Sequence, residues 1–131
     1  MLAEGNGDGV SAGFDFDGEV FWGTNGAIEA YVEVMGEVAA RLYGADDPLA
    51  TFLRDELEVF FQGKVVLLDA CVESAEGRRR LLRVLDEATS QIVSGDTLTE
   101  YGRTWVATTI SALRAKLTAP DTKRNDGSSS A

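Results

Sequence analysis

The chain has 131 residues, a length that suits one domain with a single hydrophobic core. Its apolar fraction of 44% excludes wholesale disorder, and no apolar run approaches the roughly 18 residues that a transmembrane helix needs. The formal net charge of −10 argues against nucleic acid and anionic membranes as partners, because both would repel the chain.

The scarcity of histidine and cysteine limits the catalytic, metal-binding and disulfide chemistry open to the chain. The chain has no histidine, the commonest general base and metal ligand, so a catalytic site would have to use carboxylates, Lys, Tyr or Arg. A single cysteine, Cys71, excludes an internal disulfide and suits a reducing compartment. The first six residues carry neither a basic nor an apolar segment, which predicts no secretory signal. We therefore expect a cytoplasmic protein that is not an enzyme and has no metal site and no cofactor.

The negative charge is concentrated in the first half of the chain. Residues 1–63 hold 13 acidic and two basic residues, a net charge of −11, whereas residues 64–131 hold nine acidic and ten basic residues, a net charge of +1. A basic protein partner would be attracted to the first half. The alternative is that the acidity only keeps the protein soluble.

A short β-hairpin is predicted near the N-terminus, after a polar, Gly-rich segment over residues 1–13 that we expect to be flexible. In residues 14–22, apolar side chains flank Asp17-Gly18, a pair favoured in two-residue type I′ turns. Because an isolated hairpin is marginally stable, its apolar side chains should pack on helices. These side chains are Phe14, Phe16, Val20 and Trp22. Trp22 is also the tryptophan that we expect to be partly exposed at an interface.

The clearest helix begins at Thr24 or Asn25, either of which can be its N-cap, and ends at Gly44. An i, i+3, i+4, i+7 spacing of apolar residues marks its buried face. Carboxylates four residues apart line the opposite face, and we call them the acidic row: Glu29, Glu33 and Glu37. Like charges at this spacing cost a helix roughly 0.2–0.5 kcal/mol per pair, so we interpret the row as a surface that binds a basic partner. A plain solvated face is the alternative.

A second helix is predicted to begin with Asp47 as N-cap and Pro48 as its first residue, and to end at Gly63. Glu56 falls within its apolar arc, where an unpaired carboxylate would be costly, so we expect Glu56 to meet an arginine or to lie at the exposed end of the arc. Residues 64–72 fit either a buried helix or a strand. We favour a helix, because no other long strand is available to pair with them.

Two further helices complete the predicted fold. Ser74 is the expected N-cap of the first, and a capping box of Thr97 and Glu100 opens the last. The last helix is expected to bury one face, made of Leu98, Tyr101, Trp105, Thr109, Ala112 or Leu113, and Leu117. Residues 119–131 have little to bury and are predicted to be a disordered tail. The fold class is thus all-α or nearly so: one domain over residues 14–118, an irregular four- to five-helix bundle with a short N-terminal β-hairpin.

A basic cluster lies near the start of the helix that Ser74 is expected to cap, where the helix dipole disfavours cations. Its members are Arg78, Arg79, Arg80 and Arg83. We expect these arginines to pair with acids of the same molecule, with Asp55 and Glu56 as candidates; a bound phosphate is the alternative. Cys71 has no histidine to activate it, so we expect a small buried apolar residue rather than a nucleophile.

The segment Phe14-Asp15-Phe16-Asp17-Gly18 resembles the first motif of haloacid-dehalogenase-like phosphatases. In that family two aspartates after an apolar strand act as nucleophile and as acid/base beside Mg²⁺, which would give these roles to Asp15 and Asp17. The resemblance covers five residues and implies a long parallel sheet of alternating strands and helices. Glu19 stands where the family usually has threonine, and the rest of the chain predicts consecutive helices, so a hairpin turn is favoured.

Three functional hypotheses follow. The first is a non-enzymatic acidic protein that caps a basic protein partner, as an immunity or antitoxin-type inhibitor of a cationic toxin would. Its expected contact residues are Glu29, Glu33, Glu37, Asp15, Asp17 and Trp22. The second is a small adaptor or assembly subunit that binds through an apolar patch, and the third is a carboxylate-based, Mg-dependent phosphatase-like enzyme. The oligomeric state stays open.

Overall fold

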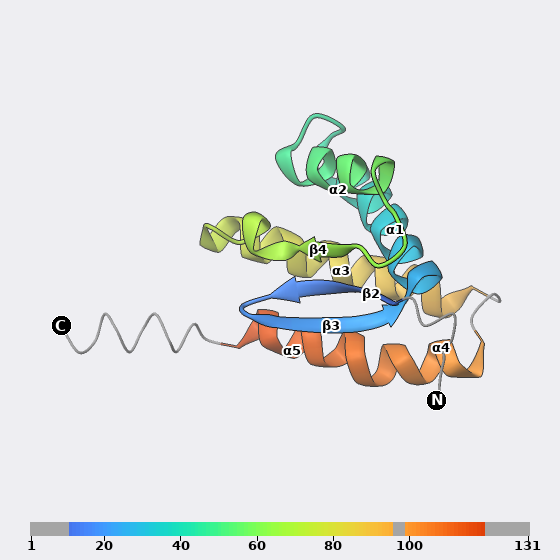
Figure 1. Cartoon of the computed structure of the whole chain (residues 1–131). Coiled ribbons are helices and arrows are strands. Elements are labelled where there is room, and N and C mark those ends of the chain that lie inside the picture. Colours follow the sequence, from blue (N-terminus) through green and yellow to red (C-terminus); the bar gives the residue numbers. More distant parts are fainter. Residues whose placement is uncertain (1–10, 96–98, 120–131) are drawn as a thin grey trace, which may run out of the picture.

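The structure is a computed structural model that describes residues 11–95 and 99–119 (Figure 1). The expectation of a mostly helical chain is confirmed, and a small three-stranded sheet stands at its N-terminal side. The strands are β2 (Ser11–Phe16), β3 (Glu19–Thr24) and β4 (Val65–Leu67). The helices are α1 (Asn25–Tyr43), α2 (Pro48–Glu58), α3 (Ala75–Ser94), α4 (Glu100–Trp105) and α5 (Ser111–Thr118), with a 3₁₀ turn over Leu68–Cys71 and a π turn over Val106–Ile110. No helix in the described part of the chain has the length and apolarity needed to cross a membrane.

Strands β2 and β3 form an antiparallel pair joined by the turn at Asp17 and Gly18. Both turn residues have positive φ, 54° and 81°, the backbone region that a type I′ turn requires. The pair begins earlier than the sequence predicts, because Ser11 already lies opposite Thr24. Residues 11–13, expected to be flexible, therefore belong to the sheet. The rest of the predicted flexible N-terminus, residues 1–10, and residues 120–131 of the predicted tail lie outside the described residues.

The helix expected over residues 64–72 is wrong. Val65–Leu67 instead forms β4, parallel to β2, with Val66 beside Phe14. The sheet order is β3-β2-β4, so β2 is the central strand. The hairpin itself supplies the pairing partner that the sequence seemed to lack, because β2 has a second edge free to accept another strand.

The sheet buries one face, and its register decides which one. Directly opposite residues share a face, and Phe14 lies opposite Phe21. Phe21 is therefore buried with Phe14, whereas Val20 and Trp22 point to the other side. The prediction that Val20 and Trp22 pack on helices is wrong for this reason. The buried face comprises Ala12, Phe14, Phe16, Phe21 and Val66.

Helix positions follow the capping residues in the sequence. The Thr24 hydroxyl accepts a 3.1 Å hydrogen bond from the Ala27 N–H, and α1 ends before Gly44, whose φ is 102°. The Asp47 carboxylate caps α2 through the Leu49 N–H at 3.0 Å. The Ser74 hydroxyl likewise caps α3 through Gly77. These four predicted boundaries are confirmed: three depend on side-chain hydrogen bonds within three residues, and the fourth depends on the positive φ that glycine tolerates at position 44.

Two predicted helix boundaries are wrong. Helix α2 ends at Glu58, and Gly63 (φ 87°) lies in the turn that leads to β4. Helix α4 begins after Thr99, whose hydroxyl caps the Gly102 N–H at 3.0 Å. Thr97, the predicted first member of a capping box, lies outside the described residues.

The last helix runs from α4 through the π turn into α5, and the π turn changes which residues it buries. A regular helix would bury Thr109 four residues after Trp105, but the wider turn places Ile110 in the core instead. Tyr101, expected to be buried, is 60% exposed. The buried residues are Trp105, Val106, Ile110, Leu113 and Leu117.

The elements form layers around one core (Figure 1). Helices α1 and α3 lie behind the sheet, the α4–α5 helix runs along β3, and α2 packs on α1. None of the described helices covers the opposite, outer face of the sheet. The outer face of α1 and the outer face of the sheet are therefore candidate binding surfaces.

Candidate binding surfaces

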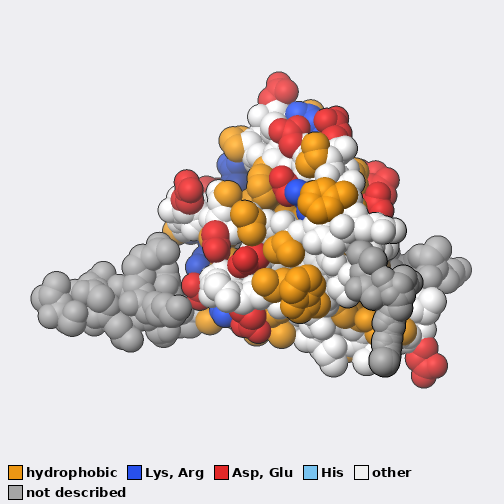
Figure 2. Space-filling model, in the orientation of Figure 1, with side chains coloured by type: hydrophobic (Ala, Val, Ile, Leu, Met, Phe, Trp, Pro, Cys, Tyr) orange, Lys and Arg blue, Asp and Glu red, His pale blue; other side chains and the backbone are white. Residues whose placement is uncertain are grey.

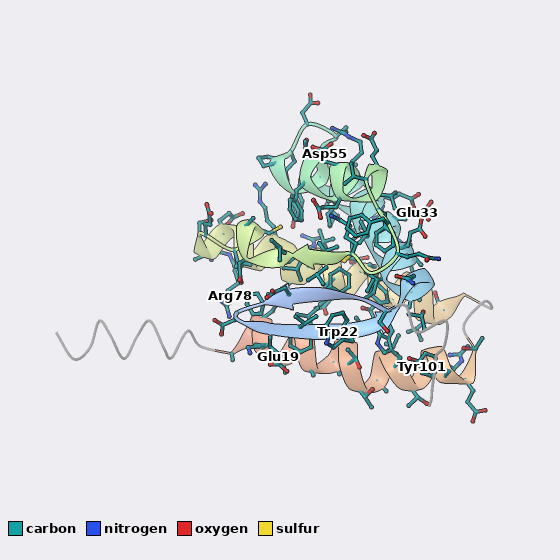
Figure 3. All side chains as sticks on the ribbon, in the orientation of Figure 1. Glu19, Trp22, Glu33, Asp55, Arg78 and Tyr101 are labelled. Carbon is teal, nitrogen blue, oxygen red and sulfur yellow. The ribbon has the colours of Figure 1, made fainter. Side chains whose placement is uncertain are left out.

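The acidic row lies where helical periodicity predicts it. Glu29, Glu33 and Glu37 are all exposed on α1, opposite the side that packs into the core. Figure 3 shows Glu33 projecting from the outside of the helix. Among the described residues none of the three forms an ion pair, and Arg41, the next basic residue on α1, is exposed. The row therefore presents three charged carboxylates to solvent.

A groove between α1 and α2 borders the acidic row. It has a volume of about 260 Å³, with Glu33 and Glu37 on its α1 side and Arg54 on its α2 side. The two helices are in contact at Gly36, where an added Cβ atom would lie 3.5 Å from the Leu53 Cβ, an ordinary van der Waals distance. The apolar lining consists of Val32, Ala40, Ala50, Leu53 and Leu57. Carboxylates and apolar side chains thus adjoin on one surface.

Two arginines of the basic cluster pair with acids of the same molecule, as expected, but with other acids than predicted. Arg80 reaches Asp47 at 2.5 Å and Glu76 at 3.0 Å, and Arg79 also pairs with Glu76. Hydrogen bonds from Arg80 and then Arg79 lower the pKa of Glu76, and the same bond to Glu76 raises the pKa of Arg80. Asp55 forms no ion pair within the described residues. The cluster therefore ties α3 to the start of α2.

Arg78 donates hydrogen bonds to backbone carbonyls instead of pairing with an acid. Its Nε donates to the Leu117 carbonyl at 2.8 Å, and its Nη2 donates to the carbonyl of Lys116 at 3.0 Å. Its guanidinium also lies 5.3 Å from the centre of the Phe16 ring. Arg83, the remaining member of the cluster, is exposed without an ion pair in the described part of the chain. Arg78 thus joins α3, the end of α5 and the sheet.

Glu56 pairs with a lysine rather than with the predicted arginine. The Lys64 Nζ lies 3.1 Å from the Glu56 carboxylate, and both side chains are largely buried. The same ammonium group lies 5.3 Å from the centre of the Phe61 ring. Sequence reasoning missed Lys64 because its position depends on β4.

The outer face of the sheet is the second candidate surface. Trp22 and Leu67 are 52% and 57% exposed, and Asp15 lies between their strands on the same face. Phe61, just before β4, is 60% exposed. Figure 2 shows apolar side chains on the face toward the viewer with acidic side chains around them, and Figure 3 places Trp22 over the sheet. An exposed apolar face edged by polar groups is typical of an interaction surface.

Asp17 belongs to neither surface. It lies at the tip of the hairpin, where its backbone N–H donates to the Asp69 carboxylate at 2.9 Å. Strand β3, which is about 17 Å long, separates this tip from the start of α1. The acidic row lies on α1, beyond the far end of that strand. At the tip, Lys116 binds Glu19 at 2.8 Å, and this hydrogen bond is the main reason that the pKa of Lys116 is raised.

The phosphatase-like motif does not assemble a metal site among the described residues. No group of three or more acidic, cysteine or histidine side chains that could hold a metal gathers in residues 11–95 and 99–119. The described sheet has a single parallel pair, β2 with β4, instead of the long parallel sheet that the resemblance implies. Asp15 lies within β2 and Asp17 occupies a turn position of positive φ.

Cys71 lines a cavity of about 300 Å³ between the start of α2 and the start of α3. Burial, and next the charge of Glu56, raise the pKa of its thiol to about 12. The thiolate is the reactive form of cysteine, so this environment disfavours nucleophilic chemistry.

We expect Cys71 to resist iodoacetamide at pH 8 in the folded protein and to react readily in 6 M urea.

Because the pKa of the Cys71 thiol in the folded state exceeds the unfolded value of 9.0, the free energy of unfolding should be unaffected below pH 9. It should then fall by at most about 1.4 kcal/mol per pH unit up to about pH 12. Urea titrations between pH 7 and 11 measure this slope. The Cys71→Ala variant should lose most of it, keeping the smaller contribution of Tyr31, whose pKa is also raised by burial. An equal slope in both proteins would contradict the assignment.

The predicted contact residues therefore divide among three places. The acidic row borders the α1–α2 groove, Asp15 and Trp22 share the outer face of the sheet, and Asp17 stands at the hairpin tip. Sequence reasoning missed Leu67, because Val65, Val66 and Leu67 are all apolar and show no alternation that would mark one of them as exposed. Comparison of the chain with protein-family models, curated proteins and solved structures finds no match.

Proposed function

We propose that this protein is a non-enzymatic binding protein whose acidic row caps a basic protein partner, in the manner of an immunity or antitoxin-type inhibitor. The observation that carries the proposal is the contrast between the acids of α1 and the cations elsewhere. Glu29, Glu33 and Glu37 stand exposed and unpaired among the described residues, while most of the described cations are engaged within the fold. The engaged cations are Arg54, Lys64, Arg78, Arg79, Arg80, Arg114 and Lys116.

No ion pair among the described residues neutralises the three carboxylates of the acidic row. Exposed like charges four residues apart destabilise the helix, so the row has a small cost in the free protein. A partner with lysine or arginine at matching positions would remove that repulsion and would be steered to α1 by long-range attraction. The groove beside Glu33 and Glu37 adds apolar area that such a partner would bury.

The triple variant Glu29→Gln, Glu33→Gln and Glu37→Gln is expected to weaken partner binding at least tenfold at low salt. The test is affinity capture from the source cells in a series of salt concentrations, followed by identification of the captured proteins. The captured set should be basic, should be retained by the wild type at low salt, and should be released as salt screens the carboxylates.

A matched variant distinguishes the effect of losing the acidic row from the effect of losing net charge. Glu73→Gln, Glu87→Gln and Glu100→Gln together remove the same charge from residues that form no ion pair among the described ones. This variant should retain the partner. Equal capture by the row variant and the wild type, or equal loss in both triple variants, would show that α1 does not recognise the partner.

A further inference from the structure

The indole of Trp22 forms a platform on the outer face of the sheet. Its cross-strand neighbour is Gly13, which has no side chain to lift the ring off the strand. A Cβ atom at Gly13 would lie 3.3 Å from the Trp22 Cε3 atom and 2.7 Å from Val20 Cγ1, so the ring rests against β2. Half of the Trp22 surface nevertheless stays exposed. An exposed aromatic face of this kind attracts cations, and guanidinium most of all because it stacks flat.

A carboxylate lies next to this platform. Asp15 is the next residue of β2 on the same face, diagonal to Trp22 across the strand pair. Its direct cross-strand neighbours are Val20 of β3 and Leu67 of β4, and Leu67 is largely exposed. Asp15 is partly buried, yet no described cation pairs with it. The central strand thus carries a carboxylate that no described cation pairs with, flanked by two aliphatic side chains and diagonal to the Trp22 ring.

We infer that the outer face of the sheet is a receptor for an arginine side chain of the basic partner. The guanidinium stacks on Trp22 and binds Asp15, while the apolar stem of the arginine packs against Leu67. This inference rests on the proposed function for the basic character of the partner, but it concerns a surface separate from the acidic row. Because no described cation pairs with the Asp15 carboxylate, this face favours a cationic side chain over an apolar one.

The probe for this receptor is the peptide Ac-Gly-Arg-Gly-NH₂, with a citrulline peptide as its neutral isostere and a lysine peptide as its point-charge analogue. The two tryptophans give two indole N–H signals in a ¹⁵N–¹H NMR spectrum. The Trp105 N–H is held by a 2.7 Å hydrogen bond to the Trp22 carbonyl, so it serves as an internal reference. The arginine peptide should shift the Trp22 signal saturably at up to tens of millimolar. The lysine peptide should bind several-fold more weakly, and the citrulline peptide at least tenfold more weakly.

The isosteric Asp15→Asn variant should bind the arginine peptide at least fivefold more weakly while the rest of its spectrum stays unchanged. The triple Gln variant of the acidic row should bind this peptide as the wild type does, so the two proposals fail independently. Three results would overturn the receptor: no shift of the Trp22 signal, citrulline binding within twofold of arginine, or unchanged affinity in Asp15→Asn. The last two would indicate an apolar contact surface instead.

Discussion

Replacing Gly23 with alanine is expected to destabilise the protein by about 3 kcal/mol. A Cβ atom at Gly23 would lie 2.5 Å from Cζ2 and 2.8 Å from Cε2 of Trp105. Trp105 is 6% exposed and is fixed by its hydrogen bond to the Trp22 carbonyl. The ring can move aside only by breaking that bond and loosening the core, so overpacking and a lost hydrogen bond act together. Urea unfolding followed by far-UV circular dichroism measures the loss.

A glycine three residues away is the matched control. A Cβ atom at Gly26, in the first turn of α1, would meet no atom within 4 Å. Gly26→Ala should therefore be neutral or stabilise by up to about 1 kcal/mol. In a Trp105→Leu background the cost of Gly23→Ala should largely disappear, because the atoms that clash are gone. An undiminished cost in that background would show that the Trp105 ring is not the cause.

Arg78→Met is expected to destabilise the protein by about 2–3 kcal/mol. The Arg78 guanidinium satisfies carbonyls at the C-terminus of α5, where a helix leaves its last carbonyl groups without partners. Its positive charge also complements the negative end of the helix dipole. Methionine keeps the apolar stem over the Phe16 ring but leaves these carbonyls unbonded. The midpoint of urea unfolding should fall accordingly.

Arg79, the next residue, is the control for the Arg78→Met variant. The Arg79 side chain is 68% exposed and pairs with Glu76, whose side chain is 56% exposed. Surface ion pairs of this kind contribute little, so Arg79→Met should change the free energy of unfolding by no more than about 0.5 kcal/mol. Similar losses in the two variants would mean that Arg78 acts through general charge rather than through its bonds to α5.

Local chemistry made part of the fold predictable. The caps at Thr24, Asp47 and Ser74 follow from hydrogen bonds to backbone groups two or three residues along the chain. The exposed position of the acidic row follows from the period of one helix, since the apolar face fixes where the glutamates point. Neither result needs information from elsewhere in the chain.

Features that depend on distant residues were not predictable. Strand β4 forms because β2 lies beside it, about fifty residues earlier in the chain, and the short segment alone fits a helix equally well. The outward position of Trp22 depends on the register that places Phe14 opposite Phe21. The π turn likewise breaks the helical period, which moved Ile110 rather than Thr109 into the core. The arginine receptor combines residues of all three strands, so only part of it was visible in the sequence.

The position of β4 in the chain has a consequence for synthesis. The hairpin of β2 and β3 emerges from the ribosome well before β4, which can join only after α1 and α2 have been made. During that interval β2 has an open edge that could pair with another nascent chain. Asp15, the last β2 residue that pairs with β4, places a carboxylate in that open segment, and charged residues there disfavour such pairing. We therefore expect the carboxylate that we propose for arginine recognition in the finished protein to disfavour edge pairing in the unfinished one as well.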